Sequence, residues 1–120
     1  MKLNMSDYTP EINPVAESFS LLSQSSRLLI LLAIGENNAC VCHLEAVLGM
    51  RQAYISQQLM LLRAAGVVKT ERNGRHIFYS LTDPSWLGLI QQAAKLKGIT
   101  LPEFELPCIE GCVYTPPDQS

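Results

Sequence analysis

Apolar residues recur at helical spacing in the first part of the chain. Asn13-Pro14 is typical of a helix start, because asparagine caps exposed N–H groups and proline suits the first helical position. One face of the helix that follows carries Val15, Phe19 and Leu22. The next apolar run, Arg27–Ile34, is nearly all leucine and isoleucine, so it predicts a second helix that is buried on most sides.

Two further helices are predicted on either side of Gly49. The first is short, Leu44–Leu48, and the second runs from about Gln52 to Ala65. The longer helix has an apolar spine of Ile55, Leu59 and Leu62, and its opposite side carries Ala53, Gln57, Met60 and Ala64. Two helices joined by a tight turn, with small and polar residues facing outward on the second, are typical of a helix-turn-helix.

Alternating patterns beyond Gly66 predict a β-hairpin. The strands are Val67–Thr70 and Ile77–Leu81, and Asn73-Gly74 between them favours a tight turn. Arg72, Arg75 and His76 flank the tip, which favours a contact with phosphate or the minor groove over a purely structural ribbon. The predicted fold is therefore mainly α with a small β-hairpin wing, a winged helix-turn-helix.

The remaining segments define the domain organisation. A final helix begins at Asp83-Pro84 or Ser85 and ends at Gly98. Its apolar face carries Trp86, Leu89 or Ile90, Ala93 and Leu96, and it either forms a dimer seam or packs within the protomer. We predict a flexible, polar N-terminal arm over residues 1–12, the winged domain over 13–98, and a proline-containing tail over 99–120.

Composition fits one small domain. The chain has 120 residues, of which 48% are hydrophobic and 17% charged, so it can bury a core. The longest apolar run, Leu28–Ile34, is far below the roughly 18 residues that span a bilayer. No apolar segment typical of a signal peptide follows Met1. We expect no membrane contact and a location in the cytoplasm, where thiols stay reduced.

Charge is unevenly distributed, although the net charge is only −2. Residues 51–76 carry a net charge of +4, and residues after Gly98 contribute −4. A basic middle with an acidic tail suits a protein that holds phosphates on one face, although such charges are usually only solvated.

Four cysteines supply the candidate chemistry: Cys40, Cys42, Cys108 and Cys112. Thiolates select soft or borderline ions such as As(III), Cd(II), Pb(II) and Zn(II). Cys40 and Cys42 alone supply too few ligands for a closed site, so we expect Cys108 or Cys112 to complete it, from the same chain or a partner. His43 is a possible substitute ligand, but a capping or surface role is favoured. Burial as small apolar residues is the structural alternative for the cysteines.

Four segments together carry a family resemblance: Ser26-Arg27-Leu28, residues 49–59, residues 62–68 and residues 73–81. In this order and spacing, they resemble the second helix, recognition helix and wing of the ArsR/SmtB family of bacterial winged-helix metalloregulators. The step Cys40-Val41-Cys42 is similar to the sulfur-rich box of its arsenic-, cadmium- and lead-sensing branch. The resemblance covers residues 24 to about 96.

The resemblance implies a homodimeric repressor of metal-resistance operons, which binds an inverted-repeat operator and releases it when metal binds. Cadmium- and lead-sensing members take further thiols from an N-terminal arm, but residues 1–39 contain no cysteine. In some of these relatives a tail cysteine is a ligand. Arsenic sensors often have a third cysteine where this chain has Glu45, and the usual aspartate is replaced by His43. The last helix lacks the ligands that zinc sensors use there.

The recognition helix and wing supply the candidate DNA contacts. Gln52, Tyr54, Ser56 and Gln57 are expected in the groove, where glutamine suits adenine. Tyr54 could also lie partly in the core, and Ser56 could cap or pack. Arg51, Arg72 and Arg75 are expected at phosphates.

Three alternatives to a metal-responsive repressor remain open. The same fold could sense oxidants or reactive sulfur through a disulfide or polysulfide. A small thiol enzyme is disfavoured, because the chain has no Cys-x-x-Cys and no evident anion-binding cysteine loop. A winged helix that contacts only proteins is the third. We expect no enzyme activity and no organic cofactor.

Overall fold

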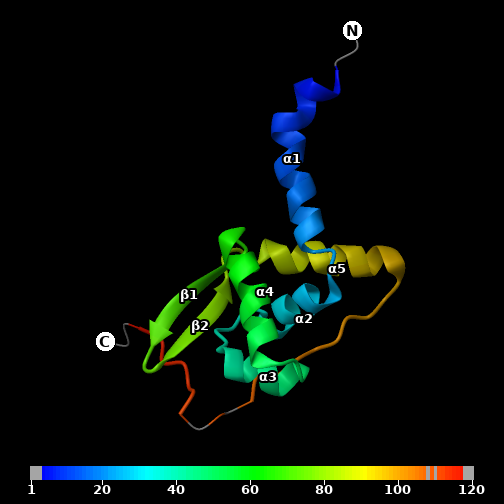
Figure 1. The fold of residues 1–120 in the computed structure, drawn as a ribbon. Helices are drawn as coiled ribbons and strands as arrows, with labels where there is room; N and C mark the ends of the chain where they lie inside the picture. The colour runs from blue at the N-terminus through cyan, green and yellow to red at the C-terminus, as the bar shows by residue number, and fades with distance from the viewer. Residues whose placement is uncertain (1–3, 108, 110, 118–120) are drawn as a thin grey trace.

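A helix-turn-helix and a β-hairpin lie together on one side of the molecule (Figure 1). The computed structural model describes residues 4–107, 109 and 111–117. Its elements, in chain order, are α1 (Met5–Leu21), α2 (Ser25–Ile34), α3 (Val41–Leu48), α4 (Gln52–Ala64), β1 (Val68–Asn73), β2 (His76–Leu81) and α5 (Ser85–Lys97). The predicted winged helix-turn-helix is confirmed. None of the helices in this described part of the chain is both long and apolar enough to cross a membrane.

The core forms where α2 packs against α3 and α4. Ile30, Leu31 and Ile34 of α2 are completely buried. The predicted spine of α4 is buried with them: Ile55, Leu59 and Leu62. The burial of one face leaves the opposite face of α4 in solvent, as expected for a helix that reads DNA.

A left-handed residue ends α3 and permits the tight turn. Gly49 has φ of +68° and its N–H donates to the Glu45 carbonyl over 2.9 Å. A side chain at this φ is disfavoured, which explains why glycine stands there. The turn then leads directly into α4 at Gln52.

The wing is longer than the sequence predicted. β1 and β2 pair antiparallel from Val68 with Leu81 to Asn73 with His76. The two-residue turn is therefore Gly74-Arg75, where Gly74 has φ of +65°, and Asn73 belongs to the strand. This shift places Arg75 at the tip itself.

The residue before the first cysteine is attached to the wing. Ala39 and Tyr79 form an isolated antiparallel bridge, with N–H to carbonyl distances of 2.9 and 2.7 Å. Cys40 therefore starts α3 directly beside β2. The wing and the N-terminus of α3 are joined by backbone hydrogen bonds.

The predicted flexible arm over residues 1–12 is wrong for residues 5–12, because α1 already begins at Met5. The Asp7 carboxylate accepts a hydrogen bond from the Asn4 N–H over 2.8 Å, so the helix is capped at Asn4 and not at Asn13. Pro10 and Pro14 lie inside the helix. Figure 1 shows α1 projecting away from the rest of the molecule.

The last helix has the predicted limits, and the tail returns from it to the wing. The Asp83 carboxylate accepts a hydrogen bond from the Ser85 N–H over 2.8 Å, which lowers the pKa of Asp83, and Gly98 ends α5 with φ of +66°. Ile90 packs into the core, while Leu96 is 79% exposed. The tail then passes α3 and reaches β1 and β2 (Figure 1).

Candidate thiol centre and DNA-contact surface

Three of the four cysteines meet at the N-terminus of α3. Cys40, Cys42, His43 and Cys112 have their potential ligand atoms within 4.8 Å of one another. The predicted contribution of the tail is thus matched in space by Cys112. Cys108 lies outside the described residues.

Local backbone structure places each thiol. Cys40 is the N-cap of α3, and Cys42 lies in its first turn. Gly111, with φ of +81°, precedes Cys112, whose N–H donates to the Ile109 carbonyl over 2.9 Å. This turn in the tail directs the third sulfur towards the helix.

The sulfur atoms form one cluster and not a single defined pair. Cys42 and Cys112 have their Sγ atoms 2.7 Å apart, and Cys40 Sγ lies against both of them. A sulfur atom forms only one S–S bond, so Cys40 cannot be bonded to both.

Two chemistries fit this cluster. The Cα atoms of Cys40 and Cys42 are 5.3 Å apart, inside the range of disulfides, whereas those of Cys40 and Cys112 are 7.4 Å apart, outside it. A bound ion accommodates the wider pair, because its ligand sulfurs need not be bonded to each other and the Cα atoms can lie further apart. The cluster can hold a thiophilic ion through three sulfurs or close a disulfide in α3.

His43 supports the helix start. Its Nδ1 accepts a hydrogen bond from the Cys40 N–H over 3.1 Å, and the side chain is only 6% exposed. Burial lowers the pKa of His43, which keeps the ring neutral and Nδ1 available as an acceptor. The capping role predicted for His43 fits this geometry, and its surface alternative does not.

Apolar side chains from the wing and the tail surround the sulfurs. Cys40, Phe78 and Cys112 are each 2% exposed or less and pack together with Cys42, Ile109 and Tyr114. The Phe78 ring centre lies 6.0 Å from that of His43 and 5.2 Å from that of Tyr114. A cavity of about 350 Å³, lined in part by His43 and Cys112, adjoins the cluster.

The exposed face of α4 carries part of the predicted DNA contacts. Gln52 and Gln57 are exposed, as is Arg51 at the N-cap. Ala53 lies on this face near the N-terminus of the helix, which is therefore small and polar there. Met60 lies on the same face further along the helix. These side chains are free of hydrogen-bonded partners within the described part of the chain and can reach a groove.

Tyr54 and Ser56 are less available than the sequence suggested. The Tyr54 hydroxyl is hydrogen-bonded to the Ser26 hydroxyl over 2.8 Å, although the side chain remains 40% exposed. Ser56 is half-buried. Both residues lie beside the exposed face, and the core position considered for Tyr54 is not observed.

The wing presents its two arginines to solvent. Arg72 in β1 and Arg75 in the turn are both exposed. The neighbouring Glu71 carboxylate does not pair with Arg72. Both of its oxygens accept hydrogen bonds from the Tyr114 hydroxyl, at 3.1 and 3.0 Å. Burial and the adjoining Glu71 raise the pKa of Tyr114, so its hydroxyl remains a donor.

Comparison with known proteins identifies the family of this chain. The chain matches the family described as "Bacterial regulatory protein, arsR family" over residues 24–70. The biofilm growth-associated repressor of Xylella fastidiosa is 39% identical over 77 residues, which cover 64% of this chain and 68% of that repressor. The chain belongs to the arsR family of bacterial regulatory proteins.

Other relatives agree with this assignment. The transcriptional repressor SmtB homolog of Synechocystis is 38% identical over 80 residues, which cover 67% of this chain and 61% of that protein. The crystal structure of the repressor BigR from Xylella fastidiosa has a TM-score of 0.67 at 33% identity, covering 78% of this chain and 96% of that one. The arsR-family chain is therefore a DNA-binding transcription regulator, and the thiol-enzyme alternative is excluded.

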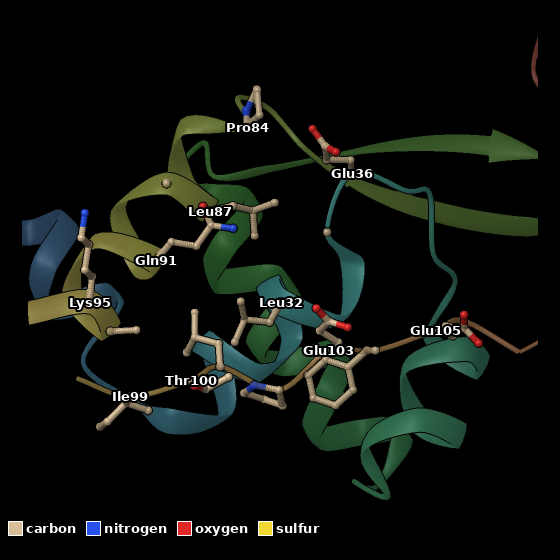
Figure 2. Close-up of a pocket in the computed structure, with 16 residues that line it drawn as sticks. Leu32, Glu36, Pro84, Leu87, Gln91, Lys95, Ile99, Thr100, Glu103 and Glu105 are labelled. Carbon is tan, nitrogen blue, oxygen red and sulfur yellow. The ribbon is translucent and has the colours of Figure 1, made fainter. Parts of the chain in front are cut away.

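A further cavity of this arsR-family protein lies away from the thiols. It has a volume of about 900 Å³ between α2, α5 and residues 99–105. Figure 2 shows Glu36, Glu103 and Glu105 towards one end and Lys95 at the other. No cysteine or histidine is among its lining residues, and its acidic end is unsuited to phosphates. We assign it no part in sensing or in DNA contact.

Some site residues had no signal in the sequence. Phe78 was predicted only as part of a strand, and Tyr114 was not singled out at all. Both lie against the sulfurs because the wing and the tail meet at the start of α3.

Proposed function

We propose that this protein is a repressor that binds an inverted-repeat operator as a homodimer and releases it when a thiophilic metal or metalloid binds its cysteines. As(III), Cd(II) and Pb(II) are the favoured inducers, and Zn(II) is a further candidate. The supporting observation is the meeting of Cys40, Cys42 and Cys112 within 4.8 Å. Cys108 is a candidate fourth sulfur. The protein would act in the cytoplasm, where its thiols are reduced.

DNA binding is assigned to α4 and the wing. Gln52 and Gln57 contact base edges, with lesser contributions from Tyr54 and Ser56. Arg51, Arg72 and Arg75 contact phosphates, since all three are exposed on the same two elements. Two such units in a dimer would meet major-groove half-sites roughly 34–36 Å apart.

The homodimer is supported by apolar side chains on α1 and α5. Ile12, Val15 and Phe19 on α1 are each more than half exposed, and Leu89 and Leu96 on α5 are exposed too. An apolar cavity of about 410 Å³ lies between these helices and is lined by Phe19, Leu89 and Ala93 among others. A second copy would cover these faces and bury them from water.

Induction follows from the position of the sulfurs. Cys40 is the N-cap of α3, and α3 packs on α4. Ligation releases the thiol protons to solvent and fixes the start of α3 relative to the tail. Operator affinity then falls by a coupling free energy of about 1–3 kcal/mol.

The test uses the reduced full-length protein. Titration with Cd(II), and separately with As(III), should produce thiolate-to-metal charge-transfer absorption and release a fluorescent operator fragment. Cys40→Ser and Cys42→Ser should each weaken the absorption band and the operator release. Without metal, neither substitution should change operator binding. Absence of the absorption band together with unchanged operator binding would exclude metal induction.

A redox trigger is the second candidate, because the Cα spacing of Cys40 and Cys42 fits a disulfide. An oxidant such as diamide would take two electrons from the two thiols, and their protons would pass to the reduced oxidant. If this signal operates, oxidation releases the operator and Cd(II) does not. A repressor of either kind must bind an operator, which distinguishes both from a winged helix that contacts only proteins.

A further inference from the structure

The tail continues from the thiol cluster onto the wing. Two residues after Cys112, the Tyr114 hydroxyl donates to the Glu71 carboxylate of β1. The Tyr114 ring also packs edge-to-face on Phe78, with an interplanar angle of 69°. One short segment therefore contacts the sulfurs at one end and both strands of the wing at the other.

The next residue of the tail is held by its backbone. The Thr115 N–H donates to Asn73 Oδ1 over 2.9 Å, and Asn73 Nδ2 donates to the Thr115 carbonyl. The asparagine amide thus pairs with both backbone groups of one residue, and the Thr115 side chain itself is exposed. Asn73 is the last residue of β1, directly before the turn that carries Arg75.

The contacts lie on one face of β1. Successive side chains of a strand point to opposite faces, so Glu71 and Asn73 share the face on which the tail lies, and Arg72 between them points away. The burial pattern agrees, since Arg72 is exposed while Glu71 and Asn73 are half-buried. The tail can therefore fix the strand without covering its arginine.

We propose that residues 112–116, the tail strap, transmit the state of the thiol cluster to the wing tip. The Tyr114 hydrogen bonds are part-buried and those of Thr115 are exposed, and such bonds are individually weak, so both depend on how firmly Cys112 is anchored. Anchoring raises the effective concentration of the strap at the wing. A ligand on Cys112 thereby holds Glu71 and Asn73 in one arrangement. Arg72 and Arg75, which lie on either side of Asn73, are held with them.

This inference rests on the proposed induction by thiol ligation, and it adds a second route beside the α3–α4 contact. The wing responds to a ligand through the strap, while the recognition helix responds through α3. Loss of the strap should therefore leave ligand binding intact and remove only the wing's share of operator release. That loss is the property to measure.

The experiment compares two double variants of the full-length reduced protein. Tyr114→Phe with Thr115→Pro removes the hydroxyl and the backbone N–H that bind Glu71 and Asn73. Val113→Ala with Thr115→Ala is the matched control, because Val113 is 65% exposed and the Thr115 backbone groups remain. Measurements are Cd(II) charge-transfer titration, operator affinity with and without Cd(II), and amide hydrogen exchange of residues 71–76.

The strap-breaking variant should bind Cd(II) like the wild type but lose the part of its response that passes through the wing. The ratio of operator dissociation constants with and without Cd(II), about 5–150-fold for typical allosteric coupling, should fall several-fold but stay above one, because the α3–α4 route remains. Exchange at residues 71–76 should become faster. The control variant should match the wild type in all three measurements.

The outcomes separate this inference from the proposed function. A wild-type ratio in the strap-breaking variant, or unchanged exchange at residues 71–76, overturns the strap. If Cd(II) has no effect on the wild type, the metal proposal fails, and Cys112→Ser then tests the strap alone. Faster exchange at residues 71–76 in Cys112→Ser supports the strap in that case, and unchanged exchange overturns it.

Discussion

Cys112 Sγ lies 2.7 Å from Cys42 Sγ, although 70 positions separate the two residues in the sequence. The first cysteine comes from the tail and the second from the first turn of α3. Closing so long a loop costs conformational entropy, so its ends meet only where other contacts or a shared ligand hold them. The packing of Phe78 against Cys40 and Cys112 supplies such contacts on the wing side.

Replacing Cys112 with serine should weaken Cd(II) binding at least tenfold, which corresponds to about 1.4 kcal/mol. Serine is a hard ligand and leaves Cys40 and Cys42 with one sulfur fewer. Competition with a chelator of known affinity, followed by charge-transfer absorption, measures the change. Wild-type affinity in Cys112→Ser would show that the tail is not part of the site, whereas Cys108→Ser reports separately on the fourth cysteine.

Replacing His43 with alanine should lower the free energy of unfolding by about 1–3 kcal/mol, because the Cys40 N–H then loses its buried acceptor. Urea denaturation of the metal-free protein measures this loss. Glu45→Ala in the same helix is the control, since Glu45 is exposed and should change stability by less than about 0.5 kcal/mol. The Cd(II) absorption spectrum should stay unchanged in His43→Ala, and a shifted band would instead identify His43 as a ligand.

Local sequence patterns were sufficient to predict the elements whose structure depends mainly on residues nearby in the sequence. The apolar spine of α4 and the glycine after α3 each depend on nearby residues, so their periodicity and turn chemistry predicted them. The start of α1 was predicted wrongly because Asn13-Pro14 is a common pair at helix starts. The helix instead begins after Asn4, whose N–H donates a hydrogen bond to the Asp7 carboxylate. The wing turn was displaced by one residue because Asn73, which can itself occupy a turn, pairs with His76 and binds Thr115.

The candidate site was only partly predictable. Spacing identified Cys40 and Cys42 as a pair, and ligand count required a third sulfur from elsewhere. The choice of Cys112 depends on contacts between the tail and the wing that have no local pattern. Tyr54 shows the opposite case, since its outward position was predicted but its hydrogen bond to Ser26, 28 residues away, was not.

Gln57→Ala and Arg75→Ala should affect operator binding in different ways. Loss of Gln57 should cost about 1–3 kcal/mol on the operator and relax discrimination at one base pair. Loss of Arg75 should weaken binding to all sequences and reduce the salt dependence by about one phosphate contact. Fluorescence anisotropy at several salt concentrations distinguishes the two, with Gln91→Ala on α5 as the control. Unchanged affinity in both variants would leave the winged helix without its proposed DNA contacts.

Phe19→Glu should convert the dimer to a monomer. Phe19 is 57% exposed on α1 and lines the apolar cavity beside Leu89 and Ala93 of α5, so a carboxylate there would be buried by a second copy without a partner. Sedimentation equilibrium of the metal-free protein measures the change. Ile77→Glu is the matched control, since Ile77 is 46% exposed on the wing, far from this cavity in the chain, and should leave the dimer intact. A dimer that persists in Phe19→Glu and dissociates in Ile77→Glu would move the interface to the wing, and with it the two DNA-contact surfaces.

Because an inverted-repeat operator requires two correctly spaced recognition helices, the monomeric Phe19→Glu protein should also lose most operator affinity while its Cd(II) absorption stays that of the wild type.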